Sequence, residues 1–362
     1  MSTDPVVPTH ASRKDEHLEL AVRLHSGDRP NAFDDVSFLH HGLPGTSAEL
    51  VDISTTVCGA RWKLPFYINA MTGGTQATAT VNAGLARAAA EAGVAIACGS
   101  QHIALREPER ADGFQVIRRE APHAFVLANV GPTVTKEQAL RAVEMLRADA
   151  LQIHLNVAQE LVMPEGDRDF QDWTERIAAI ADAVPVPVVV KEVGFGLSRR
   201  TITTLSQTGV TAVDVAGVGG TDFVAIENER RPDQDYSYLT GWGQSAVLCL
   251  LDALGGEESV GLPVLASGGV RTPLDVVRSL ALGACAVGVS GHFLRTLLRD
   301  GADGLLKELR SWADHVRTLM TLLGADSVEQ LRHTDVMVTG RTAEQASLLG
   351  VDLRRLARRS AG

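Results

Sequence analysis

The sequence lacks paired cysteines, an excess of positive charge and hydrophobic runs longer than a β-strand. Its four cysteines lie far apart and form no CxxC pair, so neither a zinc site nor a disulfide framework is predicted. The formal net charge of −10 argues against non-specific nucleic-acid binding, because no excess of cations is available to neutralise phosphates. No apolar run could span a membrane, and the first residues do not resemble the core of a signal peptide. We therefore expect a cytoplasmic protein that binds neither nucleic acid nor membrane.

The chain does contain a regular alternation of short apolar segments with helix-like segments. Hydrophobic residues make up 45% of the 362 residues, which is enough to build a sizeable core. Eight runs rich in Val, Ile and Ala end in small polar residues, at 66–71, 95–100, 125–131, 150–156, 186–194, 212–220, 263–270 and 286–291. Helix-like stretches between them lie at 78–92, 136–147, 169–183, 198–208 and 273–282. This alternation predicts βαβ units and a parallel sheet covered on both faces.

Eight such units in about 225 residues are typical of an α/β protein with a TIM (β/α)8 barrel. An open doubly wound sheet is the alternative. We expect residues 1–60 to form an N-terminal extension and residues 61–362 to form the barrel with C-terminal helices. The polar segment 222–242, between the sixth and seventh predicted strands, is either a mobile lid or a disordered surface insertion.

A dense polar cluster follows the fourth predicted strand. His154, Asn156, Gln159 and Glu160 lie within seven residues, directly after the apolar run 150–153. Placing such groups beside a core is costly unless something binds to them. Because α/β enzymes build their sites at the carboxyl ends of strands, the cluster favours a functional site over a loop that caps a helix.

Glycine-rich turns follow the seventh and eighth predicted strands. Gly268 and Gly269 precede Arg271, and Ser290 precedes Gly291. Glycines let backbone N–H groups approach an anion, and the positive end of the following helix points toward it. A lone Gly-Gly pair is usually only a tight turn, but the two strand ends together predict a phosphate site.

Other strand ends carry groups suited to a flat cofactor. Lys191 lies inside the fifth predicted strand, so its charge must meet an anion or an electron-rich partner in the barrel mouth, or else pair with Glu192 or another carboxylate. Ser100 and Asn129 end the second and third strands, where either alone would be explained as a helix cap. The loop after the first strand would let a ring lie close to the backbone; it contains Ala70, Met71, Thr72 and Gly73. Together these features predict bound FMN, with its phosphate at the glycine turns and its isoalloxazine ring over the barrel mouth.

In its motifs the chain resembles the type 2, FMN-dependent isopentenyl-diphosphate isomerases. The similarity runs from RKxxH at 13–17 through NAMTGG at 69–74, HLNxxQE at 154–160 and GGT at 219–221 to SGGVR at 267–271. RKxxH and HLNxxQE are the specific motifs, whereas the glycine motifs are shared with many flavin barrels. The resemblance implies interconversion of isopentenyl and dimethylallyl diphosphate in isoprenoid synthesis. It also implies that FMN is reduced by NADPH, acts as acid–base near N5, and is unchanged by the net reaction.

The resemblance further implies a role for each matching residue. The substrate would contact Arg13, Lys14, His17, His154, Asn156 and Gln159. Catalytic roles fall to Gln159, Glu227 and His154, and Glu160 would bind a Mg²⁺ that bridges to the diphosphate. FMN would contact Ala70, Met71, Thr72, Gly73, Ser100, Asn129, Lys191, Thr221, Gly268, Gly269, Arg271, Ser290 and Gly291. Residues 1–60 would then contribute to substrate binding, and the family suggests a homo-oligomer, either a tetramer or an octamer.

Two positions depart from the family pattern. Asp222-Phe223 stands where Ser-Trp is common after Thr221, which leaves the wall of the prenyl slot undefined. Ser290 stands where Ala is usual, and its hydroxyl could donate to the flavin phosphate.

Two other function classes compete with the isomerase: oxidoreductases, and non-enzymatic binding modules. An FMN-barrel oxidoreductase, such as a 2-hydroxy-acid oxidase, needs a His base and an Arg near the end of the sixth strand, and residues 218–222 supply neither. An IMP-dehydrogenase-like reaction needs a cysteine nucleophile in that loop, and none of the four cysteines is there. A non-enzymatic flavin- or phosphate-binding module would leave Arg13, Lys14 and Glu160 unexplained.

Overall fold

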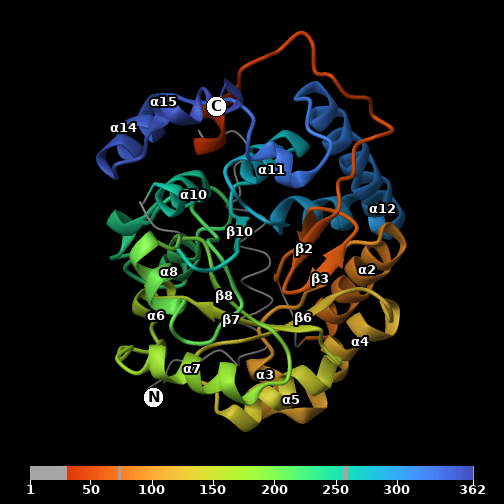
Figure 1. The fold of residues 1–362 in the computed structure, drawn as a ribbon. Helices are drawn as coiled ribbons and strands as arrows, with labels where there is room; N and C mark the ends of the chain where they lie inside the picture. Colours follow the sequence, from red (N-terminus) through yellow and green to blue (C-terminus); the bar gives the residue numbers. More distant parts are fainter. Residues whose placement is uncertain (1–30, 72–74, 256–259, 362) are drawn as a thin grey trace, which may run out of the picture.

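A closed barrel of eight parallel strands forms the centre of the computed structural model, which describes residues 31–71, 75–255 and 260–361 (Figure 1). Neighbouring strands follow chain order around the barrel, and the last pairs with the first. The strands are β4 (Phe66–Ile68), β5 (Ala95–Ala97), β6 (Val126–Val130), β7 (Ala150–Leu155), β8 (Val188–Glu192), β9 (Ala212–Asp214), β10 (Val264–Ser267) and β11 (Val287–Val289). The closed barrel confirms the predicted TIM fold and excludes the open doubly wound sheet.

Helices surround this barrel (Figure 1). The predicted helices correspond to α2 (Gln76–Ala92), α5 (Lys136–Leu146), α7 (Trp173–Ala183), α8 (Arg199–Leu205) and α11 (Pro273–Ala281). The others in this part of the fold are α3 (His102–Arg106), η2 (Pro108–Arg110), α4 (Asp112–Glu120), α6 (Val157–Val162), α10 (Ala246–Leu254) and α12 (Gly291–Leu322). No helix within the described ranges is long and apolar enough to cross a membrane.

Local side-chain chemistry explains where these elements begin and end. Thr75 and Thr135 form capping boxes at the starts of α2 and α5, where each hydroxyl accepts the backbone N–H three residues on. Gly93, at φ +73°, ends α2 in the left-handed conformation that glycine adopts without strain. All five residues of β8 are buried, including the charged Lys191 and Glu192 that follow its three valines, so both faces of the strand are covered.

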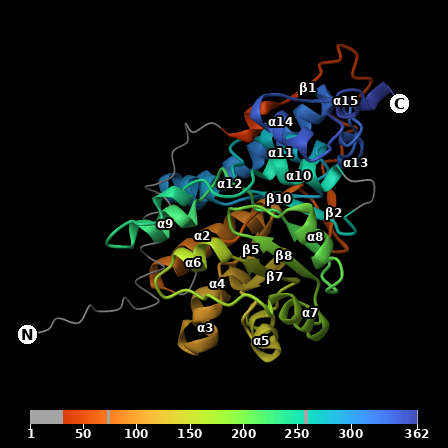
Figure 2. The ribbon, with the colours of Figure 1, turned by 90° about the vertical axis from the view of Figure 1, so that its left-hand side faces the viewer.

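The segments before and after the barrel pack against each other. The elements concerned are η1 (Ala32–Asp35), β1 (Val36–Phe38), α13 (Val328–Leu331), β12 (Val336–Val338), α14 (Gly340–Leu348), α15 (Leu353–Leu356) and η4 (Arg359–Ala361). β1 pairs antiparallel with β12, and η1 contacts α14. Figure 2 shows β1 in the same region as α14 and α15. A separate hairpin of β2 (Thr55–Val57) and β3 (Ala60–Trp62) places Trp62 against Tyr67 and Phe125. The described part of the extension is therefore integrated with the barrel and the C-terminal segment.

The polar segment 222–242 has regular structure. It contains α9 (Phe223–Glu229) and η3 (Ser237–Leu239), and Val224 on α9 is fully buried. Asp222 begins α9, with one carboxylate oxygen accepting the N–H of Ala225 at 3.0 Å and the other accepting the N–H of Gly241 at 3.1 Å. The prediction of a disordered insertion is therefore wrong, because one carboxylate ties both ends of the segment together. Motion of this segment as a lid stays a prediction.

Candidate active site

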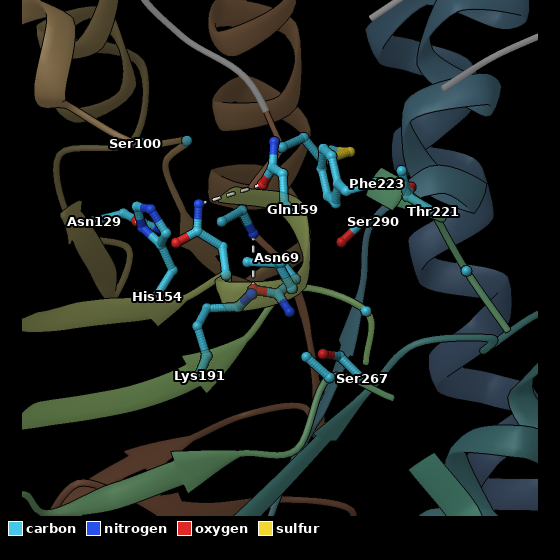
Figure 3. A pocket seen from close by; sticks show the side chains of 18 of the residues that line it. Asn69, Ser100, Asn129, His154, Gln159, Lys191, Thr221, Phe223, Ser267 and Ser290 are labelled. Atoms are coloured by element: carbon cyan, nitrogen blue, oxygen red, sulfur yellow. Dashed lines mark hydrogen bonds between the residues drawn. The ribbon is translucent and has the colours of Figure 1, made fainter. Parts of the chain in front are cut away.

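A cavity of about 620 Å³ opens at the carboxyl ends of the barrel strands (Figure 3). Residues at or just after the ends of all eight strands line it. The predicted site residues in its wall are Ala70, Met71, Ser100, Asn129, His154, Asn156, Gln159, Glu160, Lys191, Thr221, Gly268, Gly269, Arg271, Ser290 and Gly291. The remaining predictions on Arg13, Lys14, His17, Thr72 and Gly73 fall outside the described residues.

Glu227 is the predicted site residue that lies behind the wall instead of in it. Its side chain is fully buried, and Gln159 Nε2 donates to Glu227 Oε1 at 2.9 Å. Arg230 donates to the other carboxylate oxygen of Glu227. A buried carboxylate is costly unless it is paired, so Arg230 stabilises this placement. Glu227 can therefore influence the cavity through Gln159, whose amide it orients.

The Asn156–Glu160 contact shapes the turn between β7 and α6. Asn156 Nδ2 donates to Glu160 Oε1 at 2.7 Å, and the backbone N–H of Asp167 donates to Glu160 Oε2 at 2.8 Å. These two hydrogen bonds hold a carboxylate in the cavity wall.

A metal at Glu160 would not find two further His, Cys, Asp or Glu ligands among the described side chains. Across the described ranges, no cluster of three or more His, Cys, Asp or Glu side chains is arranged to hold a metal ion. The four cysteines are free thiols. Mg²⁺ prefers oxygen ligands in an octahedral arrangement, so phosphate oxygens and water would have to complete its coordination here.

A hydrogen-bonded chain of side chains connects β7, β6 and the end of β4 on one side of the cavity. His154 Nδ1 lies 2.8 Å from Asn129 Oδ1, and Figure 3 shows the two side chains together. Asn129 Nδ2 donates to Gln152 Oε1 at 3.3 Å, and Gln152 Nε2 donates to Asn69 Oδ1 at 3.4 Å. All but His154 are buried, so each amide has its orientation set by its neighbours. The chain orients the imidazole ring in the wall.

Asp214 ends this chain at the floor of the cavity. Its fully buried carboxylate accepts Tyr67 Oη at 2.8 Å, Asn69 Nδ2 at 2.9 Å and Ser267 Oγ at 2.8 Å. The backbone N–H of Ala216 also donates to it, at 3.1 Å. Burial and the Asp214 carboxylate raise the pKa of the Tyr67 hydroxyl well above its usual value, so Tyr67 serves as a donor here. Asp214 therefore joins β4, β9 and β10 beneath the site.

Lys191 is a buried cation on the neighbouring strand. It lies opposite Asp214 in the β8–β9 register, so the two side chains leave the sheet on the same face. Burial lowers the pKa of Lys191, whereas the charges of Asp214 and Glu192 raise it. Lys191 Nζ donates at 2.6 Å to the backbone carbonyl of Glu192.

The Glu192 carboxylate is engaged elsewhere. Its Oε2 accepts the backbone N–H groups of residues 193–195, at 2.6, 2.9 and 2.6 Å. Burial raises the pKa of Glu192 to about 7, against the opposite effect of those hydrogen bonds and of Lys191. Backbone donors therefore occupy the Glu192 carboxylate, and the pairing of Lys191 with Glu192 or another carboxylate stays a prediction.

The opposite side of the cavity is formed by close backbone approach. Gly268 has φ +94°, and a Cβ added to it would lie 1.9 Å from the carbonyl oxygen of Gly217. Gly219 has φ +122°, and a Cβ there would lie 3.1 Å from Gly269 Cα. The loops after β9 and β10 thus require glycine to pass one another, and they present backbone to the cavity.

Arg271 lies in the same wall, but its charge is already matched. It donates to Asp34 Oδ1 at 2.5 Å, and its Nε lies 3.5 Å from Asp275 Oδ2. The hydrogen bond with Asp34 is the largest influence that raises the pKa of Arg271. Asn31 Nδ2 also donates to the carbonyl of Gly269 at 2.7 Å, so the N-terminal segment packs against this loop.

Apolar side chains also line the cavity. They are Met71, Ile103, Trp173, Phe223 and Leu294. Phe223 therefore supplies an aromatic side chain to the cavity wall at the position where the family pattern departs.

Several residues of the site were not singled out from the sequence. Gln152 and Asp214 are polar positions inside otherwise apolar strands, and that interruption was a usable signal. Asn69 was noted only as part of a motif. Arg295, on α12 beyond the last strand, also lines the cavity, and no local pattern marks it.

Comparison with known proteins places this geometry in a family. The sequence profile of the FMN-dependent dehydrogenase family matches residues 26–158 and 102–338. The isopentenyl-diphosphate delta-isomerase of Streptomyces sp. (strain CL190) is 52% identical over 353 residues, which cover 97% of this chain and 96% of that protein. The enzyme of the same name from Listeria innocua is 45% identical, covering 96% and 97% of the two chains.

Solved structures support the fold alone. A mandelate oxidase with a monooxide FMN adduct aligns with a TM-score of 0.61 over 92% of this chain and 93% of that one, at 20% identity. The flavin-binding domain of baker's yeast flavocytochrome b2 aligns with a TM-score of 0.64 over 86% and 77%, also at 20% identity. The barrel, the cavity and the full-length similarity agree, and the chain belongs to the type 2, FMN-dependent isopentenyl-diphosphate delta-isomerase family.

Proposed function

We propose that this protein interconverts isopentenyl diphosphate and dimethylallyl diphosphate by adding a proton at one end of the allyl system and removing one at the other. The observation that carries the proposal is 52% identity to a protein named isopentenyl-diphosphate delta-isomerase over nearly the whole of both chains. The composition of the wall supports it, because His154, Asn156, Gln159 and Glu160 line the same cavity as several apolar side chains. A diphosphate with an apolar tail needs both kinds of surface.

The cavity suits FMN in its chemistry. The turns after β10 and β11 present glycine backbone at Gly268, Gly269 and Gly291, as a phosphate requires. Lys191 and Asn129 would hold the polar edge of the ring, with Ala70, Met71, Ser100 and Thr221 around it. When bound and reduced, with NADPH as the proposed reductant, FMN would supply an electron-rich acid–base group beside the allyl system.

The protein's own residues would position the substrate for proton transfer. His154 is oriented by Asn129, and Gln159 is oriented by Glu227. His154 and Asn156 would bind diphosphate oxygens, and Gln159 would contact the carbon skeleton. Glu227 would act through Gln159, as a positioning group with Arg230 as its counter-ion. The apolar side chains of the wall would help to exclude water, which strengthens these polar contacts.

Charge balance supports additional cations near the diphosphate. The net charge of −10 disfavours an anionic substrate unless local cations bind it. We assign that role to Arg13, Lys14 and His17 in the N-terminal extension and to a Mg²⁺ held by Glu160. The enzyme would act in the cytoplasm as a homo-oligomer, a tetramer or an octamer, with segment 222–242 as a lid.

The loop after β9 disfavours oxidase chemistry in the same cavity. The wall residues there are Ala216, Gly217, Gly219, Gly220 and Thr221, and none can serve as a base or bind a carboxylate as arginine does. Likeness to the oxidase structures at 20% identity therefore extends to the barrel only.

The test is anaerobic turnover of isopentenyl diphosphate with Mg²⁺, FMN and NADPH, and with controls that omit each one. We expect product formation that needs Mg²⁺ and reduced flavin and consumes no net NADPH per product. Flavin binding without isomerisation would contradict the proposal and favour an oxidoreductase with another substrate.

Glu160→Gln tests the metal assignment separately. The amide keeps the size of the side chain and one acceptor oxygen but loses the charge that Mg²⁺ prefers, so we expect Mg²⁺-dependent turnover to fall roughly 100-fold with FMN content unchanged. The measurement is turnover as a function of Mg²⁺ concentration. An unchanged Mg²⁺ dependence would remove Glu160 from the metal site.

A further inference from the structure

Arg295 is a cation in the cavity wall whose charge nothing in the described structure neutralises. It lies on the second turn of α12, four residues after Gly291, and it lines the cavity. No carboxylate or carbonyl within residues 31–71, 75–255 and 260–361 pairs with its guanidinium, and burial alone acts on it, lowering the pKa of Arg295. Partial desolvation without a partner is unfavourable for a charged group, so the position favours an anionic ligand.

Two other arginines with little exposure each pair with a carboxylate, unlike Arg295. Arg118 pairs with Asp149 at 2.7 Å, and Arg278 pairs with Asp275 at 2.9 Å. Arg271, the predicted phosphate ligand in the same cavity, already pairs with Asp34 and Asp275. Arg271 therefore carries less uncompensated charge toward the cavity than Arg295 does.

Two neighbours of Arg295, Ser290 and Gly291, are suited to binding a phosphate. A Cβ added to Gly291 would lie 3.3 Å from Arg295 Nη1, so glycine at 291 lets the guanidinium lie close to the start of α12. Ser290 precedes this helix and makes no side-chain capping hydrogen bond with it. A hydroxyl, a glycine turn and a guanidinium therefore converge on the end of β11.

We propose that Arg295 binds the phosphate group of FMN, together with Ser290 and Gly291. The proposal rests on the proposed function for the presence of FMN. The diphosphate of the substrate shares this chemistry, but the residues assigned to it, His154 and Asn156, follow β7. In the closed order of eight strands, β7 lies directly across the barrel from β11. Figure 3 likewise shows His154 and Ser290 on opposite sides of the cavity.

The experiment compares FMN with riboflavin, which has the same ring and no phosphate, in binding to the apoprotein of wild type and Arg295→Gln. We expect the FMN dissociation constant to rise about tenfold or more, as for loss of a charge-assisted hydrogen bond, with riboflavin binding unchanged. Arg295→Lys, which keeps the charge, should recover part of the FMN affinity and serves as a second variant if Arg295→Gln does not fold.

Arg299→Gln is the matched control. It removes the same charge from the same helix one turn further on, where Arg299 is exposed and pairs with Asp300. We expect it to leave both flavin affinities unchanged. Thermal unfolding of each apoprotein, measured without flavin, checks that the variants are folded.

Three outcomes would overturn the assignment. Equal weakening of FMN and riboflavin would show that Arg295 supports the ring site or the fold. Unchanged flavin binding with a raised KM for isopentenyl diphosphate would assign Arg295 to the substrate diphosphate, and unchanged values throughout would leave it without a ligand. The comparison of FMN with riboflavin needs no turnover by the wild type, so failure of the isomerase proposal would be seen separately.

Discussion

The two sides of the cavity are built in different ways. On the side of β6 and β7, side chains hold one another, from His154 through Asn129 and Gln152 to Asn69 and the floor. On the side of β9 and β10, backbone approaches backbone, and glycine is required where the loops cross. The first arrangement presents oriented amides and an imidazole, which suits contact with polar groups that change during a reaction. The second presents a fixed backbone surface, which suits a phosphate that stays in place.

Gly268→Ala should have the largest effect. It disrupts only the side of the cavity where the backbones of the loops after β9 and β10 approach each other. The added methyl group would lie 1.9 Å from the carbonyl oxygen of Gly217, at a φ of +94°. We expect a loss of about 3 kcal/mol or more in the free energy of unfolding, measured in urea, together with lost FMN. Gly350→Ala is the control, since its φ is +81° and nothing lies within 4 Å of the added methyl. Equal losses in the two variants would mean that conformational strain, and not the contact with Gly217, decides the effect.

Asp214→Ala should have the next largest effect, because it disrupts the hydrogen-bonded side chains at the floor of the cavity. Removing the carboxylate leaves Tyr67, Asn69 and Ser267 without a shared acceptor in a fully buried position. We expect about 2–4 kcal/mol of lost stability by urea unfolding. Asp214→Asn keeps one acceptor oxygen and should lose less. If both variants unfold like the wild type, the network at the floor does not stabilise the fold.

Glu192→Gln should have the smallest effect, on the pH dependence of stability. The folded-state pKa of Glu192 is raised from 4.5 to about 7, so the folded protein holds a proton there that the unfolded chain has lost. The free energy of unfolding must therefore fall as the pH rises from 4.5 to about 7. Glutamine keeps an oxygen acceptor for the three backbone N–H groups and removes the titration. Urea unfolding between pH 4.5 and about 7 should show a flatter decline than in the wild type, and an unchanged slope would contradict this origin.

Particular residues show how far the sequence could be interpreted. The apolar runs located all eight barrel strands, because strands buried on both faces need continuous apolar side chains. The HLNxxQE motif located part of the wall, since those residues are neighbours in the chain. Gln152 and Asp214 were missed although they interrupt apolar strands. Arg295 could not be found, because its environment depends on which acidic groups reach it in space.

The sequence by itself determined the succession of strands and helices, the glycines that permit close turns, and the polar groups that follow each strand. These are local properties, set by periodicity and by backbone freedom at single positions. Only the tertiary structure decided which charged side chains in the cavity wall are neutralised by other residues and which could bind a ligand. Asp34 neutralises Arg271 from 237 residues away, whereas nothing described reaches Arg295. It also decided that Glu227 lies behind Gln159, 68 residues away in the chain, because only packing determines which buried groups meet.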